Sequence, residues 1–92
     1  MKSVSAKYVA AFMKATREYY ADSWENEQGC KELLQERIDI SQKLENETDV
    51  SWFGWESILS GIYTLDPNAT DKEALGIIRL LGYNVKEESD EL

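Results

Sequence analysis

The chain has 92 residues, of which 42% are hydrophobic, and it carries a formal net charge of −8. This length fits one domain rather than two, and the apolar fraction is too high for a disordered chain. The negative charge argues against nucleic acid or an anionic membrane as the main partner, and it is compatible with a basic protein partner or with no partner.

The residue types that are missing exclude much of enzyme chemistry. The chain has no histidine, so it lacks the commonest general base and metal ligand. Cys30 is the only cysteine, which excludes an intramolecular disulfide and favours a reducing compartment. The five glycines are scattered and form no phosphate-binding loop. We therefore expect no enzymatic activity, no catalytic residue, no cofactor and no metal site.

The sequence gives no sign of a membrane or secretory address. Residues 1–7 lack the apolar core of a signal peptide, and no apolar run approaches the ~18 residues of a membrane span. We expect a cytoplasmic protein with no membrane partner.

A first helix is predicted over about 5–22, because apolar residues recur at spacings of three and four. A polar stretch follows over 23–29, where Gly29 is the expected break, although a continuous helix through Trp24 stays open. The residues on the apolar stripe are Val4, Tyr8, Ala11, Phe12, Ala15 and Tyr19.

A second helix is predicted over about 30–45, followed by a loop over 46–49. Its stripe places Cys30 toward the core, which favours an inert, buried thiol. Asp39 and Lys43 form a favourable pair one turn apart. The stripe comprises Cys30, Leu33, Leu34, Arg37, Ile38, Ser41 and Leu44, with Ile40 beside it.

A third helix is predicted over about 51–64, with Ser51 as its N-cap. It ends before Pro67, which disfavours helical geometry at the residue that precedes it. The residues expected on its apolar face are Trp52, Trp55, Ile58, Leu59 and Ile62.

The fourth helix, over about 70–81, has the clearest ends. Thr70 and Glu73 match a capping box, and Gly82 suits the left-handed turn that follows a helix. A wide apolar face holds Leu75, Ile77, Ile78, Leu80 and Leu81.

No alternating strand pattern longer than a few residues occurs, although 83–85 reads as short and extended. The expected fold is all-α: one domain over 1–86, a compact bundle of about four helices, with a short, flexible, disordered acidic tail over 87–92.

The charges are unevenly distributed. Residues 1–17 hold four basic and no acidic residues, whereas residues 18–49 hold ten acidic and three basic ones. Acids three or four apart share one helix face and present a row of negative charge to a partner. The alternative is an ordinary solvated face whose acids pair with nearby lysines or with the basic first helix. The predicted row is Glu25, Glu27, Glu32, Glu36 and Asp39.

Aromatic residues supply candidate anchors for a partner. Trp52 and Trp55 share a helix face, so Phe53 points elsewhere. An exposed Phe53 or Trp24 would anchor a partner, whereas the alternative is that the tryptophans belong to the core. Tyr20 raises the same question, because two adjacent tyrosines cannot both face the core.

We interpret the chain as a non-enzymatic acidic protein that inhibits or neutralises a basic partner. Suitable partners are a toxin, as for an immunity protein, or a nuclease or other nucleic-acid enzyme, as for a phage-encoded inhibitor acting by nucleic-acid mimicry. One alternative is a helical DNA-binding regulator, although its last two predicted helices offer only Lys72 and Arg79 as cations. Another is a structural or adaptor subunit that forms a homodimer.

Overall fold

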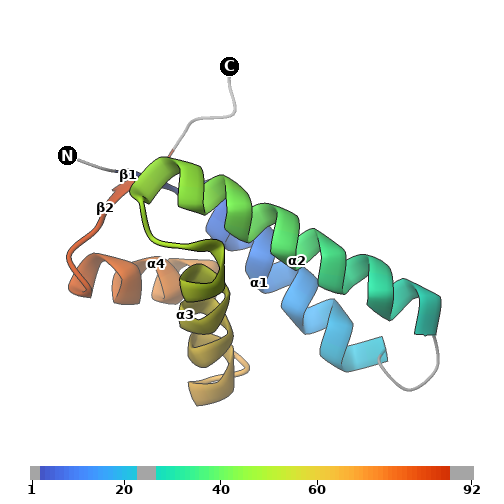
Figure 1. Ribbon diagram of the computed structural model, residues 1–92. Coiled ribbons are helices and arrows are strands. Elements are labelled where there is room, and N and C mark those ends of the chain that lie inside the picture. Colours follow the sequence, from blue (N-terminus) through green and yellow to red (C-terminus); the bar gives the residue numbers. More distant parts are fainter. Residues whose placement is uncertain (1–2, 23–26, 88–92) are drawn as a thin grey trace.

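The computed structural model describes residues 3–22 and 27–87, and within them the chain is an all-α bundle of four helices with one small sheet (Figure 1). The predicted fold class is therefore confirmed. The elements in chain order are β1 (Ser3–Ser5), α1 (Ala6–Asp22), α2 (Glu27–Thr48), α3 (Trp52–Leu65), α4 (Asp71–Leu80) and β2 (Asn84–Lys86).

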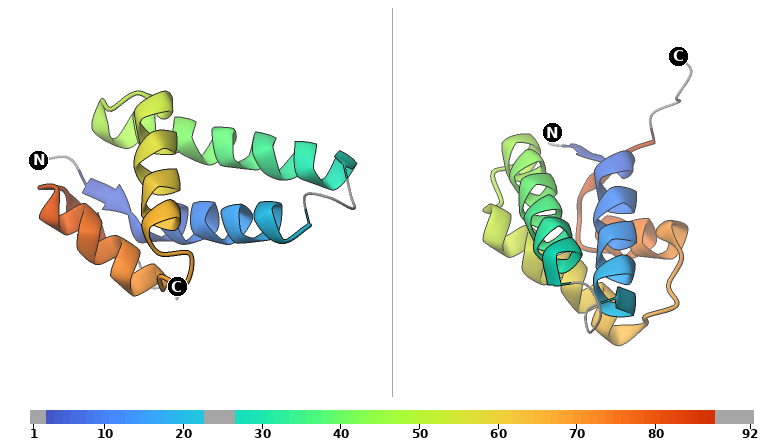
Figure 2. Two further views of the ribbon diagram at one scale, coloured as in Figure 1. Left: turned by 90° about the horizontal axis from the view of Figure 1, so that it is seen from below. Right: turned by 90° about the vertical axis from the view of Figure 1, so that its right-hand side faces the viewer.

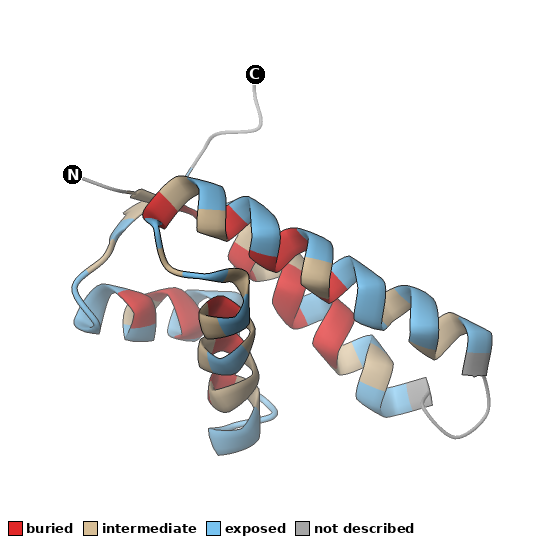
Figure 3. Cartoon of the chain, viewed as in Figure 1, coloured by how far each residue is buried: buried red, intermediate tan, exposed pale blue. Residues whose placement is uncertain are grey.

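The two longest helices, α1 and α2, lie side by side and run in opposite directions (Figures 1 and 2). α3 crosses them steeply and packs mainly on α2, while α4 packs on α1. The two strands join the start of the chain to the segment that follows α4. This arrangement leaves the outer side of α2 without a covering element among the described residues (Figure 3).

The core is one apolar cluster to which all four helices and β1 contribute (Figure 3). Its largest fully buried side chain is Trp55, whose indole N–H donates a 2.7 Å hydrogen bond to the Thr48 hydroxyl. The bond satisfies the one polar atom of this side chain, so its burial leaves no unpaired donor. The cluster comprises Val4, Val9, Phe12, Met13, Ile40, Leu44, Trp55, Leu59, Ile62, Ala74, Leu75 and Ile78.

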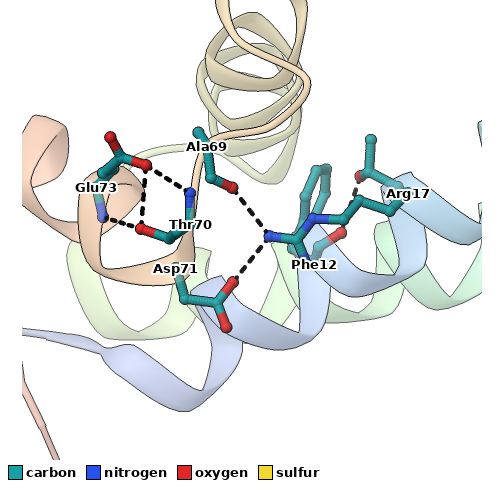
Figure 4. A network of polar contacts seen from close by, with 7 residues as sticks. Phe12, Arg17, Ala69, Thr70, Asp71 and Glu73 are labelled. Carbon is teal, nitrogen blue, oxygen red and sulfur yellow. Dashed lines mark hydrogen bonds and ion pairs between the residues drawn. The ribbon is translucent and has the colours of Figure 1, made fainter.

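The predicted caps of α3 and α4 are present. The Ser51 hydroxyl accepts a 3.1 Å bond from the Gly54 amide. At α4, the Thr70 hydroxyl accepts from the Glu73 amide at 3.1 Å, and the Glu73 carboxylate accepts from the Thr70 amide at 2.9 Å (Figure 4). Gly82 has φ +103°, the left-handed geometry expected after α4. Local sequence therefore sets these helix ends.

α2 is longer than predicted at both ends. It begins at Glu27, so Gly29 lies inside the helix rather than breaking it; one internal glycine costs only ~1 kcal/mol. The predicted loop over 46–49 is also wrong, because α2 continues to Thr48. The Thr48 hydroxyl donates to the Leu44 carbonyl at 2.9 Å and accepts from Trp55, which ties the last turn to the core. The chain leaves the helix at Asp49, where φ is +69°.

The small sheet was not predicted. β1 pairs in parallel with β2, with Val4 opposite Val85. Val4 is fully buried as expected, but it belongs to a strand and not to the first helix. Strands of three residues are too short to show an alternating pattern, and a parallel pair joins distant parts of the chain. The sequence therefore offers no local signal for this pairing.

Candidate functional site

Three of the predicted partner-binding acids lie together on the exposed outer side of α2. Glu32, Glu36 and Asp39 are all exposed, and they follow one side of the helix over about 10 Å of its axis. Arg37 and Ser41, on the side turned to the core, are buried. α2 therefore packs on the core through its inner side, and its outer side presents the three carboxylates to solvent.

The acids of this group, which we call the acidic face (Glu32, Glu36 and Asp39), are little neutralised. No ion pair joins Glu32 or Glu36 to another residue in the part of the chain that the structure describes. Asp39 accepts a 2.9 Å hydrogen bond from the Gln35 side chain, one turn earlier. Lys43, its predicted ionic partner, places its ammonium 5.6 Å from the centre of the Tyr8 ring.

Several of the cations bind acids elsewhere. Arg17, on the basic first helix, reaches the start of α4, where it contacts both the Asp71 carboxylate and the Ala69 carbonyl, the latter at 3.2 Å (Figure 4). These ion pairs join different elements, so they hold the fold together and leave the acidic face open. The pairs are Arg17–Asp71 at 3.0 Å, Arg37–Glu56 at 3.5 Å, Arg79–Glu87 at 2.5 Å and Lys86–Glu47 at 3.6 Å.

Arg37 is a buried cation that packs between the helices. Its guanidinium lies 5.2 Å from the centre of the Phe12 ring and 5.4 Å from that of Tyr19. It donates to the Ser60 hydroxyl at 2.7 Å and faces the half-buried Glu56. Its Nε has no hydrogen-bond partner among the described residues. Because Arg37 is buried and its side chain contacts both α1 and α3 from α2, it links three helices and is not available as a binding residue.

The candidate aromatic anchors are only partly placed. Phe53 is 65% exposed, and its ring makes an edge contact with Trp52 at 5.4 Å. It lies at the first turn of α3, the helix that follows α2, whereas Asp39 lies about 13 Å back along α2 from Thr48. Trp24 and Glu25 fall outside the described residues; Glu27 is the first residue of α2.

The adjacent Tyr19 and Tyr20 differ in burial, as expected for neighbours on a helix. Tyr20 is 52% exposed, and its ring stacks on Tyr63 of α3 with centres 5.1 Å apart. Tyr19 meets the edge of Tyr20 and also faces Arg37. The stacked rings of Tyr20 and Tyr63 therefore join α1 to α3, and about half of the Tyr20 surface remains exposed to solvent.

Two expectations about apolar residues need correction. Cys30 is half-buried, not fully buried, because the start of α2 projects beyond the core (Figure 3). On α4, the apolar face predicted for the core splits. Leu75 and Ile78 are buried, but Leu80 is 88% and Leu81 55% exposed. α4 packs against α1 and β2, and the apolar residues at its end that face away from these neighbours stay exposed to solvent.

An open cleft of about 600 Å³ lies where β2 follows α4, and the sequence did not predict it. Arg79, whose side chain is 44% exposed, and two residues of β2 line it. Sequence reading missed the cleft because its walls come from both ends of the chain, which only the strand pairing brings together. The lining residues are Ser3, Arg79, Gly82, Tyr83, Asn84 and Val85.

The described residues hold no group of three or more potential ligands that would suit a metal ion. Among the helices described, none combines the length and apolar character needed to cross a bilayer. No family model, no curated protein and no solved structure matches this chain.

Proposed function

We propose that the chain is a non-enzymatic binding protein that inhibits or neutralises a basic protein through the acidic face of α2. The observation that carries this proposal is that Glu32 and Glu36 are exposed and have no ion-pair partner among the described residues. Unneutralised charges on one side of a rigid helix attract an oppositely charged surface without first breaking internal pairs. Such attraction accelerates encounter and weakens as salt is added.

The spacing of the three carboxylates on α2 suits a basic groove on a partner protein. Successive acids lie about 5 Å apart along the axis of α2. Phosphates of one DNA strand follow at about 3.4 Å, so the acidic face carries a less dense charge than nucleic acid. Partners that bind nucleic acid, such as nucleases, and basic toxins both present surfaces of the required sign.

We add Phe53, at the start of α3, to the proposed surface as its apolar part. A stable interface buries about 800 Å² on each partner, which is more than three carboxylates cover. An aromatic ring that is 65% exposed is a suitable apolar anchor, because such rings are frequent among the energetically dominant contacts of interfaces.

The test begins with capture of the tagged chain and its partners from host lysate at low and high salt, followed by binding measurements with the purified partner. We expect a basic partner that high salt releases. Glu32→Lys and Glu36→Lys should each weaken binding more than Glu18→Lys does. Glu18 is an exposed acid of α1, so its reversal changes net charge equally but lies outside the acidic face.

Equal losses in all three variants would mean that only net charge matters, and the site would then be wrong. Recovery of nucleic acid, or of no basic protein, would overturn the function itself. Phe53→Ala should also weaken binding with little effect on folding, since the ring's described aromatic contact is with its neighbour Trp52.

One alternative function has a specific observation in its favour. Leu65 and Leu80 are 85% and 88% exposed, which suits an adaptor subunit that self-associates. Sedimentation of the wild-type chain and of Leu80→Lys over a range of concentrations tests this alternative. The DNA-binding alternative has weaker support, because Arg79 is already paired with Glu87. A mobility shift at low salt would revive it.

A further inference from the structure

The cleft at the corner of α4 and β2 combines a cation with a strand edge. Arg79 lines it from the last turn of α4, and Asn84 and Val85 line it from β2. Gly82, with φ +103°, lets the chain turn from the helix into the strand and forms part of the wall. The cleft therefore offers both a charged side chain and extended backbone to one ligand.

Arg79 already binds a carboxylate of the same chain. Arg79 holds the Glu87 carboxylate at 2.5 Å, and both side chains remain about half exposed or more, at 44% and 66%. A guanidinium binds a carboxylate through directed, charge-assisted hydrogen bonds. The ligand that suits Arg79 is therefore a carboxylate, and Glu87 provides one from within the same chain.

The two strands differ in what their outer edges can bind. At the edge of β1, the Ser5 amide donates to Glu47 of α2 at 2.9 Å, so α2 covers that edge. β2 is the other edge of this two-stranded sheet, and it lines the cleft. Extended peptides add to exposed strand edges through backbone hydrogen bonds. Leu80 and Leu81, which precede this segment in the sequence, are exposed apolar side chains outside the cleft lining.

We propose that this corner binds an extended acidic peptide segment of a partner protein, which adds alongside β2 and places a carboxylate on Arg79. Glu87 is then an internal competitor that occupies the cation when no partner is bound. The site uses none of the acidic face, and it recognises a ligand of opposite charge to the basic partner proposed above. The two surfaces therefore allow the chain to join a basic protein to an acidic segment.

The test uses the full chain and a fluorescein-labelled peptide that corresponds to residues 87–92, because this acidic peptide contains the carboxylate already seen on Arg79. Glu87→Gln removes the internal competitor and should tighten peptide binding by about two- to fivefold, the effect of one exposed ion pair. Arg79→Gln, combined with Glu87→Gln, should abolish the gain. Lys72→Gln is the matched control, since Lys72 is exposed on α4 outside the cleft lining.

Amide chemical shifts locate the peptide. We expect changes at residues 82–86 on addition of the peptide and none at residues 32–39. Equal binding by the Arg79→Gln and Lys72→Gln variants would overturn the role of Arg79. Shifts confined to Arg79, with residues 84–86 unmoved, would overturn strand addition. Failure of binding in Glu87→Gln would overturn the whole proposal, whatever the outcome for the acidic face.

Discussion

Replacement of Glu47 tests how the unpredicted sheet is attached to the helices. The Glu47 carboxylate accepts hydrogen bonds from both the amide and the hydroxyl of Ser5, and it also lies 3.6 Å from the Lys86 ammonium. Ser5 is only 1% exposed, and the Glu47 side chain is 18% exposed. One carboxylate near the end of α2 thus holds both strands.

The cost of Glu47→Ala follows from these contacts. Hydrogen bonds to a charged group contribute about 1.5–3 kcal/mol each, and a buried donor left without a partner costs about 1–3 kcal/mol. Partial exposure reduces the sum, and the ion pair with the half-exposed Lys86 adds little. We expect the free energy of unfolding to fall by about 2–3 kcal/mol, out of a total near 5–15 kcal/mol. Glu47→Gln keeps an acceptor oxygen and should cost about 1 kcal/mol.

Urea denaturation measures the effect. With a slope of about 1–2 kcal/mol per molar, the midpoint should fall by roughly 1–3 M. Amide exchange should show that β1 and β2 lose protection before α2 does. Glu32→Ala removes the same side chain from an exposed position of α2 and should change stability by less than ~0.5 kcal/mol. If Glu47→Ala matched Glu32→Ala, the attachment described here would be wrong.

Further predictions concern the caps and the buried polar groups. Thr70→Ala removes the capping box of α4 and should cost about 1 kcal/mol, measured as a lower Tm. Hydrogen bonds from the backbone and hydroxyl of Thr70 lower the pKa of Glu73. The stability that this cap contributes should therefore be present at neutral pH and be lost as the pH falls through the lowered pKa. An NMR titration in which Glu73 has an ordinary or raised pKa would contradict this. Thr48→Val leaves the buried Trp55 N–H without its acceptor and should cost about 1–3 kcal/mol in urea, and a change below 0.5 kcal/mol would refute the bond. Arg37→Met roughly preserves the side-chain volume and removes a buried Nε that has no hydrogen-bond partner among the described residues. It should therefore destabilise the fold less than Arg37→Ala does, by at least ~1 kcal/mol in urea denaturation. The reverse order would show that the charge itself is required.

The helical class was predictable because its signals are local. The spacing of apolar residues identified four helices, and the capping box at Thr70 with the glycine at Gly82 located the ends of α4 within a residue or two. The inward placement of Arg37 was also predictable, since it falls on the apolar stripe of α2. These features depend on residues within one or two turns of each other, which the sequence displays directly.

The errors arose where distant residues decide the outcome. Residues 46–48 read as a loop, but the bonds of Glu47 to Ser5 and of Trp55 to Thr48 keep them helical. Val4 fits a helical stripe, but its pairing with Val85 makes it a strand residue. Contacts between different elements, such as Ser5 with Glu47 and Val4 with Val85, override weak local preferences, and no local sequence pattern predicts them.

The sequence by itself determined that Glu32, Glu36 and Asp39 share a face of one helix, because helical periodicity fixes that placement. Only the tertiary structure decided that this face stays open. The cations expected to neutralise it were nearby lysines and the basic first helix; of these, Arg17 pairs with Asp71 of α4, and the Lys43 ammonium lies over the Tyr8 ring. Charge pairing depends on distances in space, and packing of the helices sets those distances.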